Sequence, residues 1–110
     1  MQKSLTTFII LFSIFSFSQE ITIKGSIKDN KNRSIQNASV SLLDENNDFL
    51  GYDFTNENGL YSISFDKTKN QTIKIEISCL GYKKITQTIN ATNQNLNYQL
   101  EEKIESLQEV

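Results

Sequence analysis

The sequence predicts an all-β fold, a small seven-stranded antiparallel β-sandwich. From residue 20 onward, polar and apolar residues alternate with period two over short stretches, and no stretch of useful length has helical periodicity. Polar clusters separate these stretches roughly every 8–12 residues, the spacing typical of a sandwich. The alternation favours antiparallel pairing, because buried parallel strands read as continuous apolar runs. We expect strands at 20–29, 38–44, 49–55, 60–65, 72–79, 83–89 and 95–100.

The first element is an N-terminal segment that precedes the predicted sandwich. It carries one cation, Lys3, followed by an apolar run from 8 to 17 and ending in small serines. This arrangement is typical of a secretory signal, and the run is shorter than the roughly 20 apolar residues of a membrane span. We interpret residues 1–18 as a cleaved signal peptide with Gln19 as the first mature residue. The alternative is an uncleaved membrane anchor.

The strands follow in order, each with one face predicted to be buried. In most of these strands the larger apolar residues lie on one parity and the polar residues on the other. We expect these residues to form one core, with Gly25 on the inward parity of the first strand: Ile21, Ile23, Ile27, Val40, Leu42, Tyr61, Ile63, Phe65, Ile73, Ile75, Ile77, Leu96, Tyr98 and Leu100.

Residues 19–101 are therefore predicted to form one domain, and 102–110 a charged tail. The formal net charge is −2 and the charges are scattered, which excludes a nucleic-acid footprint and a polybasic membrane patch. The single cysteine, Cys79, rules out a disulfide within the chain, so the core must hold the domain. Cys79 shares the parity of the inward isoleucines before it, and we expect a buried, inert thiol.

The stretch "TNENGLYSISF" (55–65) resembles the middle of a calcium-binding loop. Placing Gly59 sixth puts Asn56 third and Asn58 fifth, as such a loop requires. The first and twelfth positions are then Phe54 and Phe65, which cannot bind a cation. We therefore expect a turn, in which Asn and Gly adopt left-handed backbone, and "ENG" predicts a hairpin.

No other segment supplies a catalytic, cofactor or metal site. In "DENND" (44–48), Phe49 stands where a calcium loop needs glycine, so this cluster is expected to be a solvated turn. The chain has no histidine, which excludes the common zinc sites and the Ser-His-Asp and Cys-His nucleophiles. Its carboxylates fall in predicted turns, without a pocket to raise their pKa for acid–base work. No glycine-rich phosphate loop and no small-molecule substrate can be identified.

Four motifs, in this order and spacing, resemble the carboxypeptidase-regulatory-like domain of Bacteroidetes envelope proteins. They are "GSIKD" (25–29), "SIQNASV" (34–40), "TNENGLY" (55–61) and "SCLGY" (78–82), and the resemblance covers about residues 20–101. Two positions depart from the family pattern: Ser34 replaces the usual proline, and Asn37 replaces the usual glycine. The resemblance implies a transthyretin-like sandwich of seven strands.

The resemblance also implies a location and a function. In that family the domain commonly lies in the periplasm, at the N-terminus of TonB-dependent outer-membrane receptors. There it precedes a segment that leads into the plug, and "LQEV" (107–110) matches the first half of that segment. We therefore expect an exported, non-enzymatic accessory domain of the periplasm or outer membrane. It would contact envelope proteins such as the receptor or TonB-system components, and the chain would be a receptor N-terminus cut short.

A sugar- or surface-binding module and a hydrolase are the alternatives to a protein-binding accessory domain. A free-standing carbohydrate- or surface-binding sandwich would need exposed aromatic side chains on one face. Tyr52, Phe54 and Tyr82 are the residues that could contribute to such a face. A hydrolase is nearly excluded by the residues present, because the chain has no histidine and its carboxylates are expected to be exposed.

Overall fold

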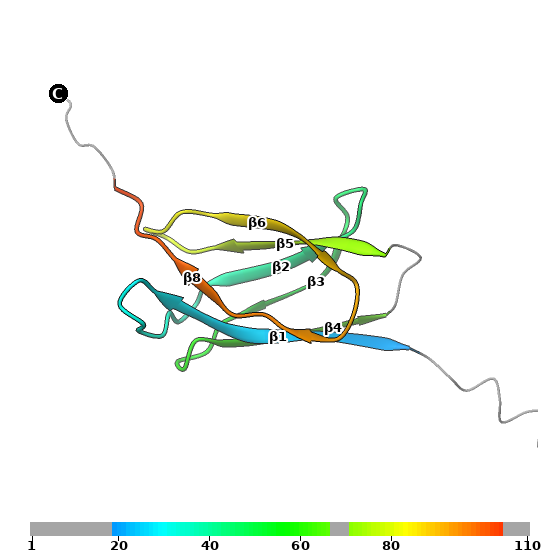
Figure 1. The fold of residues 1–110 in the computed structure, drawn as a ribbon, viewed down its shortest axis with the longest axis horizontal. Coiled ribbons are helices and arrows are strands. Elements are labelled where there is room, and N and C mark those ends of the chain that lie inside the picture. Colours follow the sequence, from blue (N-terminus) through cyan, green and yellow to red (C-terminus); the bar gives the residue numbers. More distant parts are fainter. Residues whose placement is uncertain (1–18, 67–70, 105–110) are drawn as a thin grey trace, which may run out of the picture.

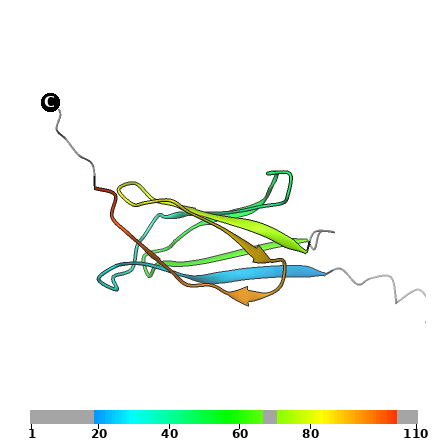
Figure 2. The same cartoon turned by 45° about the horizontal axis from the view of Figure 1, so that its top comes forward.

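A computed structural model describes residues 19–66 and 71–104, and it places them in two β-sheets packed face to face (Figure 1). Figure 2 shows the two layers from a second direction. The predicted all-β sandwich is confirmed. Its strands are β1 (Glu20–Asp29), β2 (Ser39–Leu43), β3 (Phe49–Phe54), β4 (Leu60–Asp66), β5 (Thr72–Ser78), β6 (Ile85–Asn90), β7 (Gln94–Asn95) and β8 (Tyr98–Leu100). Among the described residues, no helix is long and apolar enough to cross a membrane.

The first sheet has the strand order β4-β1-β7, and β8 also pairs with β1. The second sheet has the order β3-β2-β5-β6. β1 and β4 pair antiparallel with Ile23 opposite Ile63, while β2 and β5 pair antiparallel with Leu42 opposite Ile75. Because these residues share the inward parity of their strands, both sheets turn an isoleucine- and leucine-rich face toward the space between them.

The core lies between these two faces and confirms the predicted side-chain directions. Each buried isoleucine or leucine contributes about 1.5–3 kcal/mol relative to an exposed one, and no disulfide is needed to explain the fold. Leu96 and Tyr98 are only partly buried, and both pack against the core. The predicted core residues that are buried are Ile21, Ile23, Ile27, Val40, Leu42, Tyr61, Ile63, Phe65, Ile73, Ile75, Ile77 and Leu100.

The last predicted strand, 95–100, differs from the prediction in two ways. It forms two short strands, β7 and β8, so the structure has eight strands, and both pair parallel with β1. The interruption falls at Leu96, whose carbonyl accepts a hydrogen bond from the Tyr61 hydroxyl at 2.7 Å. Next to it, Asn97 Oδ1 accepts the Ser26 amide at 2.9 Å. These side-chain bonds replace backbone bonds, and the ladder stops there.

The hairpin predicted at "ENG" is wrong, because β3 and β4 lie in different sheets. The chain instead crosses from the second sheet to the first through Thr55, which is 2% exposed. The Thr55 hydroxyl donates to the Ile35 carbonyl at 2.7 Å and accepts the Ala38 amide at 2.9 Å. The segment before β2 therefore holds the end of β3, and the next residues continue in the other layer.

Residues 101–103 join the far end of the sandwich. The Lys83 amide donates to the Glu101 carbonyl, and the Lys103 amide donates to the Gly81 carbonyl, each at 2.8 Å. These bonds bring the chain back from β8 in the first sheet to the loop that precedes β6 in the second sheet. The predicted signal peptide (1–18), most of the predicted turn at 67–71 and the tail segment 105–110 lie outside the described residues.

Candidate functional site

The calcium look-alike at 55–65 is one of three turns with the same hydrogen-bond pattern. In each, the side-chain oxygen of an Asp or Asn accepts the amides of the second and fourth residues after it, as Asx turns do. Asn56 accepts Asn58 at 2.9 Å and Leu60 at 3.0 Å. Asp29 accepts the amides of Lys31 at 2.8 Å and Arg33 at 2.9 Å. Asp44 accepts the amides of Asn46 at 2.8 Å and Asp48 at 3.0 Å.

The third residue after each Asp or Asn has left-handed backbone. It is Asn32 (φ 66°), Asn47 (φ 66°) or Gly59 (φ 74°), residue types that adopt this conformation at low cost. Gly59 is additionally required by space, since a Cβ there would lie 2.6 Å from the Ile27 carbonyl oxygen. The three turns therefore have one structural explanation, which accounts for both the "TNENG" and the "DENND" sequences.

This geometry supports the prediction that "TNENG" is a turn. The Asn56 oxygen that would bind a cation already accepts two backbone amides. Phe65, at the last ligand position of the calcium pattern, is 6% exposed and belongs to the core. Within 19–66 and 71–104, no group of three His, Cys, Asp or Glu residues is placed to hold a metal ion.

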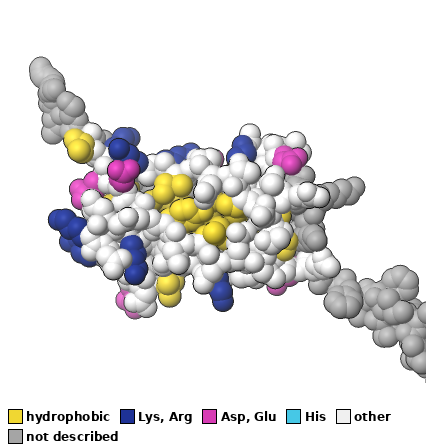
Figure 3. Space-filling model, viewed as in Figure 1, with side chains coloured by type: hydrophobic (Ala, Val, Ile, Leu, Met, Phe, Trp, Pro, Cys, Tyr) yellow, Lys and Arg dark blue, Asp and Glu magenta, His cyan; other side chains and the backbone are white. Residues whose placement is uncertain are grey.

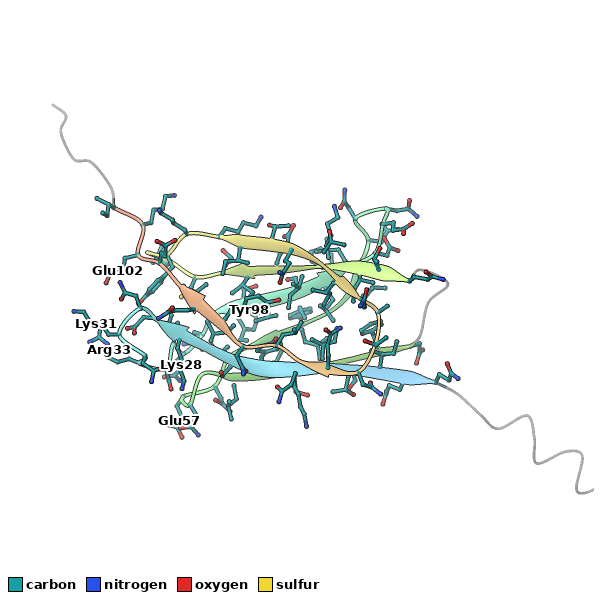
Figure 4. The ribbon with its side chains drawn as sticks, in the orientation of Figure 1. Lys28, Lys31, Arg33, Glu57, Tyr98 and Glu102 are labelled. Carbon is teal, nitrogen blue, oxygen red and sulfur yellow. The ribbon has the colours of Figure 1, made fainter. Side chains whose placement is uncertain are left out.

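Asp29 differs from the other two turn residues because it also holds an arginine. Its side chain is almost fully buried, and its Oδ2 lies 2.9 Å from Arg33 Nε. Hydrogen bonds from the Arg33 backbone amide lower the pKa of Asp29, against the effect of burial, and the Lys31 amide and Arg33 guanidinium act in the same direction. Figure 4 shows Arg33 and Lys31 together in this turn.

Asp29→Asn is expected to destabilise the domain at pH 7 and to have a smaller effect near pH 3. A carboxylate whose pKa is lowered by folding stabilises the native state above its unfolded pKa of about 3.9, and this contribution is lost as pH falls through the folded value. Urea unfolding of the wild type and of Asp29→Asn at the two pH values measures the difference in their free energies of unfolding. Asp44→Asn, which removes no ion pair, should lower the free energy of unfolding by less at pH 7. If Asp29→Asn lowered the free energy of unfolding equally at pH 7 and pH 3, this explanation would be contradicted.

Cys79 is partly buried and packs against the core. Cys79 was predicted to be buried, and it is only partly so. The reason is its position, directly after the last residue of β5 and before the exposed Leu80. No chemistry is assigned to this thiol.

A shallow groove of about 500 Å³ crosses the outer side of the first sheet near β3. Several of its polar side chains bond backbone groups. Asp53 Oδ2 accepts the Ser62 amide at 3.0 Å, and Asn97 Oδ1 accepts the Ser26 amide and hydroxyl. These bonds explain the polar side chains by their structural role, and no ligand is assigned to the groove.

The most distinctive surface feature is an aromatic pair on β3, formed by Tyr52 and Phe54. The two side chains are 66% and 55% exposed, and their ring centroids are 6.0 Å apart. They lie opposite Ser41 and Ser39 of β2, so they form an aromatic edge beside a row of small hydroxyl side chains on the outer face of the second sheet. Tyr82, the third aromatic candidate from the sequence, is partly buried against the core and does not join the pair.

The architecture is that of a β-sandwich module, and its candidate site is the exposed aromatic pair on β3. Residues 23–110 match the family model of the CarboxypepD_reg-like domain, and the chain belongs to this family. The recognised resemblance is thereby confirmed. No curated protein matches the chain in sequence.

The structure explains several family motifs. Asn37, which replaces the usual glycine, has φ 65°, a left-handed conformation that asparagine also tolerates. Thr55 and Gly59 of the "TNENGLY" motif are the buried hydroxyl anchor and the left-handed turn residue described above. The buried anchoring role of Thr55 was missed from the sequence, because nothing in the alternation pattern separates it from a solvent-facing threonine.

Solved structures with the same fold include a catechol 1,2-dioxygenase of Acinetobacter radioresistens. It is 12% identical with a TM-score of 0.63, over 81% of this chain and 54% of that protein. The shaft pilin SpaA of Lactobacillus rhamnosus GG is 10% identical with a TM-score of 0.62, over 79% of this chain and 49% of the pilin. The chain thus spans about half the length of these proteins. At such identities the likeness shows the fold alone.

Proposed function

We propose that this chain is an exported accessory domain of the cell envelope, the N-terminal module of a TonB-dependent receptor, and that it acts by binding a protein partner without catalysis. Membership of the CarboxypepD_reg-like family supports this proposal. The signal-like segment 1–18 and the receptor-like "LQEV" at 107–110 support the location and the receptor context.

The observation that carries the proposal is the exposed aromatic pair. Exposed aromatic side chains gathered on one strand are the usual anchors of protein contacts, because they bury a large area at low entropic cost. Tyr52 and Phe54 lie on β3, an edge strand of the second sheet, opposite Ser41 and Ser39 of β2. A partner that covers this surface would desolvate both rings without displacing any core residue.

A carbohydrate-binding module is the second candidate, and the same two residues would serve it. Stacking of a sugar ring favours an open aromatic face or a flat platform. Tyr52 and Phe54 stand at an interplanar angle of 82°, so the edge of one ring meets the face of the other and they form no common platform. This geometry favours the protein partner. Binding of the purified chain to a glycan array, lost on replacing Tyr52, would instead establish the second candidate.

The double variant Tyr52→Ser/Phe54→Ser is expected to weaken partner binding at least tenfold, since removal of two anchors of an interface typically costs about 2 kcal/mol or more for each. The measurement is affinity purification of the tagged chain from the envelope of its own bacterium, with quantification of receptor and TonB-system proteins. Leu80→Ser is the matched control, because Leu80 is an exposed apolar side chain in the loop between β5 and β6 and is not part of the aromatic pair.

The control variant should retain the partner at the wild-type level. Equal recovery of these proteins with the double variant and with wild type would contradict the assignment of the aromatic pair as the contact surface. Recovery of none of them with any variant would contradict the proposed receptor context.

A further inference from the structure

The two sheets have exposed edges, and the structure covers them to different degrees. On one side of the sandwich, the edge strands β3 and β4 lie close together. The carboxylate of Asp53 on β3 points inward and accepts the Ser62 amide of β4, and the pairing of β2 with β3 is irregular at Leu42/Leu43. An inward charge and a bulge are standard means of preventing an edge strand from pairing with another chain. This side is therefore protected.

The edge of β6 on the other side is open. Within residues 19–66 and 71–104, β6 pairs with β5 alone, with Ile73 opposite Ile89 and Ile75 opposite Gln87. The Ala91 amide donates to the Gln71 carbonyl, which shows that odd-numbered residues of this ladder exchange hydrogen bonds with β5. The amides and carbonyls of Thr86 and Thr88 therefore point outward, and no hydrogen bond found in the described part of the chain uses them.

The composition of β6 offers none of the usual protection. "ITQTIN" has no charge, no proline and no irregularity in its pairing, and its Ile and Thr residues favour extended backbone. Figure 3 shows an apolar patch on this side of the molecule, between β6 and β8. Partly buried Ile85, Leu96 and Tyr98 belong to the strands and loop on either side of it. Tyr98 crosses between the layers, and its hydroxyl bonds Gln87 Oε1 at 2.6 Å (Figure 4).

The sequence of this edge is the same in both directions. Ile85-Thr86-Gln87-Thr88-Ile89 is a palindrome centred on Gln87. We propose that β6 pairs antiparallel with β6 of a second copy of this chain, about a two-fold axis through Gln87, which joins the two second sheets into one continuous sheet. A two-fold contact requires a self-complementary surface, and a palindromic strand provides one.

The proposed register matches the direction of the open backbone groups. With Gln87 on the axis, Thr86 lies opposite Thr88 of the second copy, and each such pair exchanges both N–H···O bonds. Threonine opposite threonine is a favourable cross-strand pair. Ile85 lies opposite Ile89 of the second copy, on the face that continues the core. Lys84 lies opposite Asn90, so no like charges meet.

This contact is independent of the proposed function, because it uses the β6 edge and leaves the aromatic pair on β3 free. Its failure and the failure of partner binding can therefore be distinguished. Variants at 86 and 88 test the pairing of two β6 strands, while variants at 52 and 54 test the binding of a protein partner.

Sedimentation velocity over a concentration series tests the proposal, with the full chain expressed in a periplasm and purified from it. The wild type is expected to form a dimer. Thr86→Lys/Thr88→Lys places like charges opposite each other and should weaken the dimer at least tenfold. Thr86→Lys/Thr88→Glu places opposite charges together in the proposed register and should restore the dimer. These side chains are exposed on the outer face, so the fold is expected to persist.

A single cysteine gives a second readout. Residues opposite each other in a pair without hydrogen bonds have Cα atoms about 4.5 Å apart, within the range of a disulfide. Gln87→Cys should therefore form a disulfide-linked dimer under oxidising conditions, whereas Lys31→Cys in the β1–β2 turn should not. A wild type that stays monomeric at every concentration overturns the proposal. This holds even if β6 is then found to pair with a strand of another protein, because the proposed partner is a second copy of this chain. A dimer that survives in the lysine double variant also overturns it.

Discussion

Ile75→Asp is expected to leave the domain unfolded at 25 °C. Ile75 is fully buried on β5, an inner strand of the second sheet, and lies between Leu42 of β2 and Gln87 of β6. Loss of its packing alone costs about 2–5 kcal/mol. An unpaired carboxylate at the same place adds a desolvation penalty of several kcal/mol. Together these approach or exceed the total stability of a small domain, about 5–15 kcal/mol.

Ile75→Val is the matched control, because it removes one methylene and adds no polar group. It should cost about 1 kcal/mol and lower Tm by about 5 °C. Circular dichroism and thermal melting measure both variants. If the aspartate variant melted like the wild type, the inward direction of β5 and the register built on it would be wrong.

Gly25→Ala is expected to destabilise the domain by about 3 kcal/mol, the upper part of the range for overpacking. A Cβ on Gly25 would lie 1.7 Å from the carbonyl oxygen of Leu96, which is backbone. The chain at Leu96 would have to move away from β1. That movement would break the bond from the Leu96 amide to the Lys24 carbonyl and the bond from the Tyr61 hydroxyl to the Leu96 carbonyl.

Gly51→Ala separates this collision from the general cost of replacing a glycine. Its Cβ would approach a methyl group of Ile63 to 2.7 Å, which is a less severe collision than the 1.7 Å approach of a Gly25 Cβ to a backbone carbonyl. Chemical denaturation should therefore show a smaller loss for Gly51→Ala than for Gly25→Ala. The opposite order would mean that the passage of the chain beside Gly25 is described incorrectly.

Much of this fold could be predicted from period-two alternation, because a strand with one buried face repeats every second residue. The inward residues of β4 and β5 were identified in this way, as were the turns rich in Asn and Asp. Local pattern identifies which residues face the core, but it carries little information on which strand pairs with which.

The two differences from the prediction have this origin. A turn such as Asn56–Gly59 is equally suited to a hairpin and to a crossing between sheets, and the choice depends on the contact of Thr55 with Ile35 and Ala38, some 20 residues earlier. Likewise, the parallel pairing of β7 and β8 with β1 depends on a glycine at 25 that lets the Leu96 carbonyl approach. Neither contact leaves a periodic signal in the sequence.

The candidate site could be predicted only in part. The calcium pattern could be tested against the residues at its ends, and Phe54 and Phe65 were sufficient to reject it. The common structure of the turns at Asp29, Asp44 and Asn56 is visible in the sequence only after the hydrogen bonds have been seen. Exposure of Tyr52 and Phe54 required the structure, because an edge strand at the rim of a sandwich has the same alternation as an inner one.

In the proposed function, the exposed aromatic pair on β3 binds an envelope protein. The most direct measurement is photo-crosslinking in the cells that naturally produce the protein, with a photoreactive residue at position 52 and, as control, at position 80. We expect a covalent adduct between position 52 and an outer-membrane receptor or TonB-system protein, with no such adduct from position 80. The absence of a protein adduct at position 52, or equal adducts at both positions, would contradict it.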